Sequence, residues 1–444
     1  MTIVSKIDRL KNHQEFVRYF KNTSWLIGER ILRMAVGLFV GIWVARYLGP
    51  SQFGLFSYAQ SFVGLFIALS TLGLDGVIVR ELVKDQSKRD ALLGTAFTLK
   101  LIGAFSVLLL LIFAVNLISI DAQTKLLVIV IASATIFQSM NVVDFYFQSK
   151  VLGRYVVFAN SFTLLSSSAI KIWFIINGAP LIAFAWLVVL DSAILSLDYA
   201  YFYFMAGGKI KYWSFDRHLA VSLLKDSWPL IFSSIVVSIY MRIDQVMIKE
   251  ILGAEAVGQY AAAVRLSEAW YFIPVVVVSS LFPAIIDAKK QSEKLYHAHL
   301  QKLYDLMVWI AVAIALPVTF LSSWVVNLLY GEQYGLAGGV LIIHIWAGVF
   351  VFIGVASGRG LLADNLQIHN FLRALSGMLV NLILNTILIR KFGIHGAAIS
   401  TLVSYVVASY LYDLFNNKTR QMFYTKTRSI FFINYFVRAK RFCD

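Results

Sequence analysis

The chain has 444 residues, of which 59% are hydrophobic and only 14% are charged, and its mean hydropathy is +0.75. Soluble domains average about 45–50% apolar and about 25% charged residues, so most of this chain is expected to face lipid. The net charge of +15 leaves a nucleic-acid ligand open until the basic residues are located. A single cysteine, Cys443, excludes a disulfide framework and any cysteine-based metal site. The first 23 residues are mixed and charged, which predicts that no cleavable signal peptide is present.

Long apolar runs predict the fold class. Inside hydrocarbon every backbone N–H and C=O group needs a partner within the protein, so a membrane-spanning chain is helical or a closed barrel. The runs are about 20 residues long, the length of a spanning helix, and they lack the alternation of barrel strands. We therefore predict an all-α polytopic membrane protein with twelve transmembrane helices. In chain order these cover 24–46, 54–74, 96–120, 125–148, 152–176, 180–206, 228–249, 257–286, 304–329, 336–362, 368–390 and 393–415.

Lysines and arginines gather on one side of these predicted helices. If the N-terminus is cytoplasmic, 28 of the 39 lysines and arginines fall in cytoplasmic segments and five fall on the opposite side. Cytoplasmic loops of membrane proteins carry such an excess of positive charge, so we expect both termini in the cytoplasm. The excess of basic residues is then explained by the orientation of the helices in the membrane, and we expect no nucleic-acid partner.

No connecting segment is long enough to form a soluble domain. The longest, 207–225, has six predicted helices on each side. We predict an N-terminal lobe over residues 1–208, with a cytoplasmic amphipathic N-terminus, and a C-terminal lobe over residues 209–416. Residues 417–444 are predicted to form a basic cytoplasmic tail, whose apolar piece 429–437 is too short to span a membrane and is typical of an interfacial segment.

One short pattern occurs once in each predicted half. It reads Leu-Gly, four residues, Gly, one residue, an aromatic residue, two residues and Ala, at 48–59 and at 252–263. The offset is 204 residues at every matched position, and both copies join equivalent pairs of predicted helices. This predicts parallel halves related by an axis along the membrane normal. We interpret the first glycine as a left-handed helix end and the second as a point of close helix approach, hence as scaffold rather than a binding site.

Charged side chains at membrane depth are the candidate functional residues. A duplicated helical bundle without soluble domains is the architecture of an alternating-access transporter, whose substrate lies between the halves. A charge at the bilayer centre costs about 2.5–3.5 kcal/mol on insertion scales, so such positions point to function. Arg30 and Arg33 are three residues apart on one face of the first helix, and we expect them to be unpaired. Because guanidinium groups bind phosphate in a bidentate way, these two predict an anion-binding surface.

Further charges lie in other predicted helices. Arg265 and Glu268, also three residues apart, form either a neutralised pair that stabilises the bundle or part of a functional site. Asp244 and Asp191 are carboxylates in the seventh and sixth predicted helices.

Several stretches resemble a known family. They are "RYLGPSQFG" (46–54), "LSTLGLDGVIVREL" (69–82), the run 242–274, "LFPAI" (281–285) and "KFGIHGAAISTLVS" (391–404). These are similar to the polysaccharide flippases, the Wzx-type branch of the MOP exporter superfamily, and the resemblance covers nearly the whole chain. It implies a MATE-like arrangement of two lobes. Some relatives have fourteen helices, whereas twelve and a short tail are predicted here.

The resemblance also implies a function. The substrate would be an undecaprenyl-diphosphate-linked oligosaccharide, a repeat unit of O-antigen or a related surface polysaccharide, moved from the cytoplasmic to the periplasmic leaflet of a bacterial inner membrane. A polysaccharide polymerase and chain-length proteins would be partners, beside membrane lipid. The diphosphate would meet a cationic cavity, for which the matching positions are Arg30, Arg33 and Arg265. Export would be coupled to H⁺ or Na⁺ through a carboxylate, with no other cofactor and no metal; the candidates are Asp244, Glu268 and Asp191.

Three other functions are weighed against this one. A MATE-like exporter of cationic drugs would need an uncompensated acidic cavity, and the surplus of arginine in the first helix argues against it. A membrane-embedded polysaccharide polymerase or ligase would need a large periplasmic loop with catalytic residues, and no such loop or catalytic motif is predicted. A purely structural protein would have little reason to keep so many charges at depth. We therefore predict a transporter rather than an enzyme.

Overall fold

The computed structural model of the chain describes residues 3–117 and 121–431, and for residues 3–24, 26 and 27 it describes the backbone alone. In this part of the chain all regular elements are helical and no strand occurs. The helices are α1 (Ile3–Thr71), α2 (Asp75–Lys84), α3 (Arg89–Leu117), α4 (Ala122–Phe137), α5 (Val142–Ser149), α6 (Gly153–Ile176), α7 (Leu181–Met205), α8 (Arg217–Leu252), α9 (Ala254–Glu268), α10 (Phe272–Gln291), α11 (Glu293–Tyr330), α12 (Ala337–His344), α13 (Ala347–Ala363), α14 (Gln367–Ser409) and α15 (Arg420–Ile430). Short 3₁₀ turns are η1 (Gln86–Lys88), η2 (Gln138–Asn141), η3 (Ile210–Tyr212), η4 (Glu332–Tyr334) and η5 (Leu411–Leu414).

The described residues contain ten segments that are long and apolar enough to cross a membrane. Two of these segments bend at a glycine with non-helical backbone angles, where two helices meet: Gly49 within 28–84 and Gly393 within 367–414. The all-α polytopic membrane fold is therefore confirmed. The number of twelve crossings stays a prediction.

The two copies of the repeated pattern form the same local structure. Gly49 and Gly253 have φ angles of +71° and +91°. Both lie in the left-handed region that glycine adopts at little cost. Gly49 divides α1, and Gly253 separates α8 from α9. The interpretation of this glycine as a left-handed helix end is confirmed in both copies.

The second glycine of each copy contacts the backbone of the other copy. A Cβ atom on Gly54 would lie 1.8 Å from the carbonyl oxygen of Ala254, and one on Gly258 would lie 1.9 Å from the carbonyl oxygen of Pro50. The two contacts are equivalent, because Ala254 and Gly258 follow Pro50 and Gly54 by the repeat offset of 204 residues. The predicted close approach is confirmed, and such a reciprocal pair is what a two-fold relation between the copies produces.

By its internal contacts the chain forms two compact units. Unit 1 comprises Met1–Val44 and Phe62–Ile235, and unit 2 comprises Ala45–Ser61 and Val236–Asp444. The boundaries fall within α1 and α8, so both helices contribute to both units. The division into lobes at residues 208 and 209 stays a prediction.

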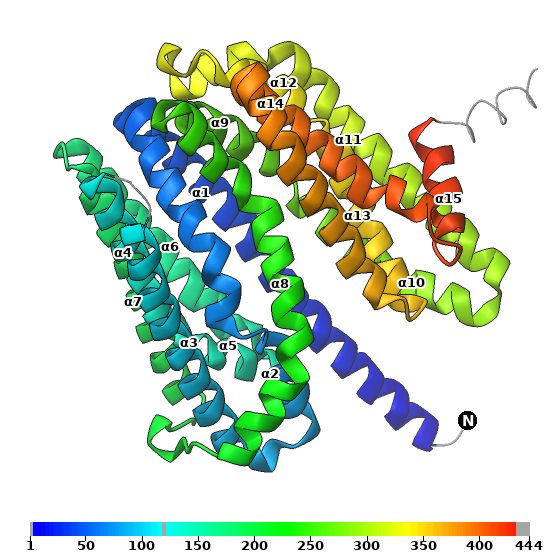
Figure 1. The fold of residues 1–444 in the computed structure, drawn as a ribbon. Coiled ribbons are helices and arrows are strands. Elements are labelled where there is room, and N and C mark those ends of the chain that lie inside the picture. The colour runs from blue at the N-terminus through cyan, green and yellow to red at the C-terminus, as the bar shows by residue number, and fades with distance from the viewer. Residues whose placement is uncertain (1–2, 118–120, 432–444) are drawn as a thin grey trace, which may run out of the picture. The chain divides into compact units, whose positions relative to one another are not determined.

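Unit 1 contains a layer of long helices with a compact core at one end. In Figure 1, α4 lies beside α3 and α7, and α6 packs on α7. The core is formed where α2, α5 and the first part of α8 meet the ends of these helices. Its fully buried members include Ile78, Phe147 and Tyr203.

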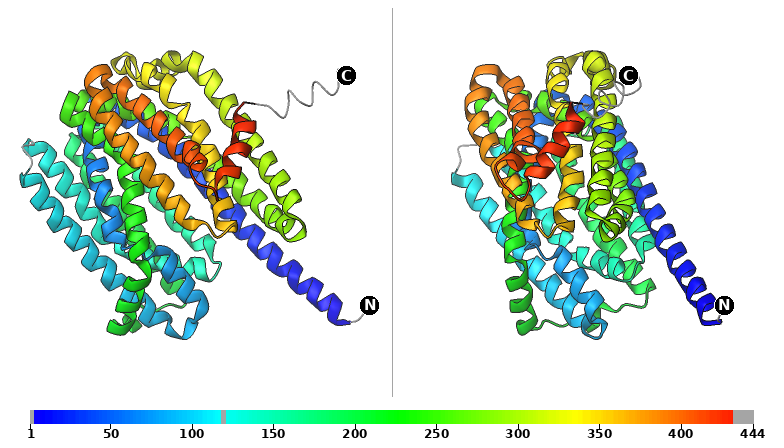
Figure 2. Two further views of the ribbon diagram at one scale, coloured as in Figure 1. Left: turned by 45° about the vertical axis from the view of Figure 1, so that its right-hand side comes forward. Right: turned by 90° about the vertical axis from the view of Figure 1, so that its right-hand side faces the viewer.

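Unit 2 is built around α11, α13 and α14. Figure 2 shows α13 and α14 side by side, and α13 also packs on α11 and α10. Met307, Phe352 and Ile353 lie in the core between these helices. The shorter helices α9 and α12 pack on each other and on α14.

Helix α8 begins at Arg217, although the apolar run predicted a helix only from residue 228. The carboxylate of Asp216 accepts hydrogen bonds from the backbone N–H groups of His218 at 2.8 Å and Leu219 at 3.0 Å. Such an N-cap satisfies the first free N–H groups of a helix. The apolar run did not reveal this start because Lys225 and Asp226 separate the first turns of α8 from the apolar run that follows.

The predicted tail contains a helix that the apolar pattern did not predict. Helix α15 covers Arg420–Ile430 and overlaps the predicted apolar piece 429–437 only at its first two residues. The part of that piece from residue 432 onward, and Cys443, lie outside the described residues.

Candidate functional site

Unit 2 buries a carboxylate among hydroxyl and amide groups. Asp244 of α8 is only 6% exposed. Its carboxylate accepts hydrogen bonds from the Tyr260 hydroxyl of α9 at 2.8 Å and from the Thr401 hydroxyl and Asn385 amide of α14, both at 2.6 Å. The Asn385 amide also donates to Asn381 at 3.0 Å. We call these five residues the Asp244 cluster.

Helix α14 contributes to the Asp244 cluster from both sides of its bend. Asn381 and Asn385 are four residues apart and so share one helix face, while Thr401 lies beyond Gly393. The two segments approach closely because Gly396 has no side chain: a Cβ atom there would lie 2.0 Å from the carbonyl oxygen of Leu388. The bend therefore brings polar side chains from two segments onto one carboxylate.

The Asp244 carboxylate has no counter-ion among the described residues: no lysine, arginine or histidine forms an ion pair or hydrogen bond with it there. An ionised carboxylate buried in this way carries a penalty of several kcal/mol, which a bound proton or cation removes. Near it, the side-chain oxygen of Asn385 and the side-chain nitrogen of Asn381 are buried and have no hydrogen-bond partner in this part of the chain. Carboxylate, amide and hydroxyl oxygens are the ligands that hard cations prefer. The Asp244 cluster can therefore hold a proton or a small cation.

The arginines predicted in the first helix differ from each other. Both lie on α1 in unit 1, and both are exposed. Arg33 pairs with Glu29, whose carboxylate also accepts a hydrogen bond from the Arg33 Nε at 2.7 Å. The expectation that both arginines are unpaired is therefore wrong for Arg33. Glu29 is four residues earlier, on the same face of the helix, where opposite charges attract. Arg30 stays a candidate anion ligand.

Arg265 and Glu268 lie one turn apart on α9 in unit 2. The Arg265 guanidinium carbon lies 5.8 Å from the ring centroid of Phe53, a residue of the first repeat copy, which is within the range of a cation–π contact. Both side chains are partly buried. Their roles in anion binding and ion coupling stay predictions.

Asp191 differs from Asp244 because it has a counter-ion. It lies on α7 in unit 1, and its carboxylate accepts a hydrogen bond from the Ser167 hydroxyl at 2.8 Å and lies 3.5 Å from the Lys171 ammonium of α6. Lys171 also donates to Ser167 at 2.7 Å. Of these two candidates, Asp244 therefore has the stronger need for a bound cation.

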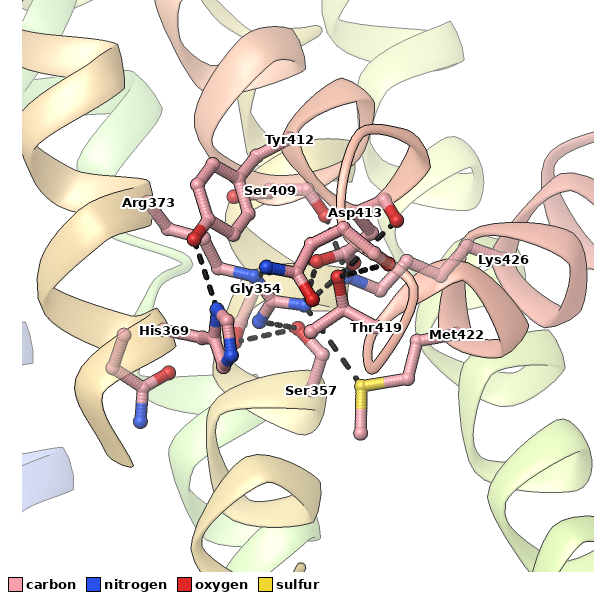
Figure 3. Close-up of polar contacts among 12 residues, drawn as sticks. Gly354, Ser357, His369, Arg373, Ser409, Tyr412, Asp413, Thr419, Met422 and Lys426 are labelled. Carbon is pink, nitrogen blue, oxygen red and sulfur yellow. Dashed lines mark hydrogen bonds and ion pairs between the residues drawn. The ribbon is translucent and has the colours of Figure 1, made fainter. Parts of the chain in front are cut away.

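A second buried cluster, within unit 2, holds α15 against η5 and α14 (Figure 3). Asp413 of η5 lies between two cations: the Arg373 Nε donates to it at 2.9 Å, and the Lys426 ammonium of α15 donates at 2.7 Å. Lys426 also donates to the backbone carbonyl of Ser409 at 2.7 Å, and Arg373 donates to Ser357 at 3.1 Å. Burial and the positive charge of Arg373 lower the pKa of Lys426 from 10.5 to about 7, although Asp413 acts in the opposite direction. We call Arg373, Asp413 and Lys426 the α15 clamp.

The fold of the chain occurs in solved transporter structures. The lipid II flippase MurJ, in an inward closed conformation, matches with a TM-score of 0.72 at 15% identity, over 94% of this chain and 93% of its own. An inward-facing multidrug resistance MATE family transporter of the MOP superfamily matches with a TM-score of 0.70 at 16% identity, over 89% of this chain and 96% of its own. The fold is therefore that of the MOP superfamily transporters.

The sequence comparisons name the family within that class. A family model described as polysaccharide biosynthesis protein matches residues 19–289, and the chain belongs to this family. The probable low-salt glycan biosynthesis flippase Agl15 of Haloferax volcanii is 25% identical, over 84% of this chain and 78% of its own. The putative O-antigen transporter of Shigella flexneri is 23% identical, over 86% of this chain and 93% of its own. The resemblance to polysaccharide flippases of the MOP superfamily is thus confirmed.

Proposed function

We propose that the protein is a flippase that moves undecaprenyl-diphosphate-linked oligosaccharides from the cytoplasmic to the periplasmic leaflet of a bacterial inner membrane. The observation that carries the proposal is the family match over residues 19–289, together with a MOP transporter fold. Relatives whose names describe a glycan biosynthesis flippase and an O-antigen transporter support it. In this proposal the chain is a transporter rather than an enzyme, both termini are cytoplasmic, and a polysaccharide polymerase and chain-length proteins act on the exported unit.

We further propose that transport is coupled to an H⁺ or Na⁺ gradient through the Asp244 cluster. Three donors from α9 and α14 hydrogen-bond one carboxylate of α8 and so join these helices. A bound cation neutralises the buried carboxylate and thereby stabilises this packing of the helices. Loss of the cation leaves a buried charge that is stabilised only by neutral groups, which favours a different packing of the same helices. A cation gradient can act on the helix arrangement in this way.

The diphosphate of the substrate is assigned to Arg30, Arg33 and Arg265 as its cationic ligands. This part of the proposal rests on the bidentate geometry that guanidinium offers to phosphate. Because Glu29 already engages Arg33, Arg30 is expected to contribute more of the binding free energy than Arg33.

Transport by the purified protein in vesicles tests the function and the coupling together. We expect a labelled lipid-linked oligosaccharide to accumulate in one leaflet when an H⁺ or Na⁺ gradient is imposed. Asp244→Asn is nearly isosteric but removes the charge that binds the cation, so accumulation should fall at least about tenfold. Asp191→Asn, which removes a carboxylate that Lys171 already neutralises, is the matched control and should retain most of the accumulation.

Two results would contradict these proposals separately. Gradient-driven accumulation of equal size in Asp244→Asn and in the unaltered protein would remove Asp244 from coupling while leaving the flippase function intact. Transport of a cationic drug without any movement of the lipid-linked oligosaccharide would instead favour the MATE-like function.

A further inference from the structure

A polar cavity of about 420 Å³ opens between the beginning of α11 and the exposed side of α15. Its lining includes His297 and Gln301 of α11 and Gln421, Tyr424 and Arg428 of α15, and no aspartate or glutamate lines it. We call it the α11–α15 cavity. It lies within unit 2 and involves none of the residues proposed for transport.

The walls of the α11–α15 cavity are fixed from both sides. The Gln301 amide donates to the backbone carbonyl of Thr425 at 3.2 Å and to the Ser429 hydroxyl at 2.7 Å, and Ser429 donates to Asp305 at 2.7 Å. On the opposite face of α15 the fully buried Lys426 anchors the helix through the α15 clamp. The cavity is therefore a built feature of the fold rather than a gap beside a loose helix.

The polar groups left to the cavity are mostly hydrogen-bond donors. Within the described residues the side chains of Arg428, Gln421 and Tyr424 have no hydrogen-bond or ion-pair partner. His297 has one acidic neighbour, Glu293 at 3.6 Å, which is itself 70% exposed. A free guanidinium with an amide and a phenol beside it fits a phosphate, because guanidinium groups make paired hydrogen bonds to phosphate oxygens.

Charge near the cavity also favours an anion. The α15 clamp sets two cations against one carboxylate, so it carries an excess positive charge whenever Lys426 is protonated. Lys426 lies on the same helix as Arg428, so this excess adds to the attraction for a negative group. The nearby Asp305 carboxylate opposes it, although it accepts hydrogen bonds from Gln301 and Ser429.

The position of the cavity along α11 indicates a membrane lipid as the source of that phosphate. Helix α11 has 38 residues and is about 57 Å long at 1.5 Å per residue, whereas the hydrocarbon core is about 30 Å thick. Its charged residues all lie between Glu293 and Asp305, and Leu306–Tyr330 carries none. The charged end, which contains the cavity wall, therefore reaches headgroup depth.

The exposed side of α15 agrees with this depth. Tyr424, four residues before Arg428 on α15, is 54% exposed, and Phe431, the residue after the end of α15, is 61% exposed. Aromatic residues and arginine are enriched where proteins meet the headgroup layer. We propose that the α11–α15 cavity binds the phosphate of an anionic phospholipid headgroup, with Arg428 as its main ligand.

Binding of phosphatidylglycerol to the purified full-length protein in neutral detergent tests the proposal. Native mass spectrometry counts bound lipids over a concentration series and gives an apparent affinity. We expect Arg428→Gln to bind phosphatidylglycerol about tenfold more weakly, since it loses the charged, paired hydrogen bonds. Arg420→Gln removes the same charge from an exposed arginine of the same helix outside the cavity lining, and should bind like the unaltered protein.

Three results would overturn the proposal. Equal affinity of Arg428→Gln and the unaltered protein would remove the cavity as the binding site. Equal binding of phosphatidylcholine, which has no net charge, would exclude selection of an anionic lipid. Displacement of bound phosphatidylglycerol by millimolar inorganic phosphate would assign the cavity to free phosphate instead of a lipid. Because none of these measurements involves transport, they are independent of the proposed flippase function.

Discussion

At the scale of single residues, the need of a buried carboxylate for a bound cation depends on the side chains around it rather than on its depth in the membrane. Asp191 and Asp244 both lie in apolar helices, yet Asp191 has Lys171 beside it, whereas Asp244 has only hydroxyl and amide donors among the described residues. Sequence spacing found both carboxylates but gave no reason to rank them. The ranking came from contacts that join α7 to α6 and α8 to α9 and α14, which no local sequence pattern encodes.

Substitutions of Arg30 and Arg33 test whether these two arginines of α1 contribute differently to transport. Arg30→Ala should abolish surface polysaccharide in a host that depends on this protein, because it removes a cation that has no described acidic partner. Arg30→Lys should restore part of it, since the charge remains but the paired hydrogen bonds are lost. Surface polymer and the amount of protein in the membrane are measured together, so that loss of protein is recognised.

Arg33→Ala provides the comparison within the same helix. Because Glu29 engages Arg33, we expect Arg33→Ala to reduce the polymer less than Arg30→Ala does. Normal polymer levels in both variants would take the two arginines out of the transport mechanism.

At the scale of elements, glycines and a cap set positions that apolar patterns alone do not. The left-handed ends at Gly49 and Gly253 were predictable, because the repeated Leu-Gly marks a helix end. The early start of α8 at the Asp216 cap was missed because Lys225 and Asp226 interrupt the apolar pattern. Asn381 and Asn385 were not predicted, because they are uncharged amides. Two amides four residues apart in an otherwise apolar run are a signal that would have found them.

The crossing of the two repeat copies should not tolerate a side chain. Gly54→Ala and Gly258→Ala each place a Cβ atom within 2 Å of a backbone carbonyl oxygen, so the helices must separate. We expect either change to lower the yield of folded protein strongly, as measured by size-exclusion chromatography in detergent. Gly37→Ala, in the helical part of α1, places its Cβ atom more than 4 Å from any atom beyond its neighbours and the backbone of its own helix, and should behave like the unaltered protein. Normal yields of Gly54→Ala would contradict the close approach.

Docking of α15 should depend on pH through Lys426. In the folded state its pKa is about 7, below the ordinary value of 10.5. Between these values the unfolded state binds the proton and the folded state does not, so the contribution of Lys426 to stability rises as the pH increases from about 7 to about 10. Below pH 7 Lys426 is protonated in both states, so the folded state carries the full free-energy cost of burying the charged ammonium group.

Thermal unfolding across this pH range measures the effect. The Tm of the unaltered protein minus the Tm of Lys426→Met should increase with pH, because the contribution of Lys426 to stability rises. Groups common to both proteins, including Arg373 and His369, cancel in this difference. Lys418→Met, at an exposed position of the same segment, should give a difference that is constant with pH. A constant difference for Lys426→Met as well would contradict the lowered pKa.

At the scale of the whole molecule, the class of protein could be predicted from the sequence, whereas the composition of the Asp244 cluster could not. Apolar length, charge asymmetry and motif resemblance led to an all-α MOP transporter of the polysaccharide biosynthesis family, which the comparisons confirm. These signals are distributed along the chain and survive without tertiary information. The Asp244 cluster is assembled from three helices, α8, α9 and α14, and only the folded chain brings its members together.

The reciprocal glycine contacts have a consequence for how a duplicated chain diverges. After duplication most positions of the two halves can change independently, because each half has its own surroundings. At Gly54 and Gly258 a side chain on either copy would strike the backbone of the other, so neither copy gains freedom from the presence of its twin. At this crossing each copy therefore limits the side chains that the other can accept, which accounts for the glycines that the two copies still share at 48–59 and 252–263.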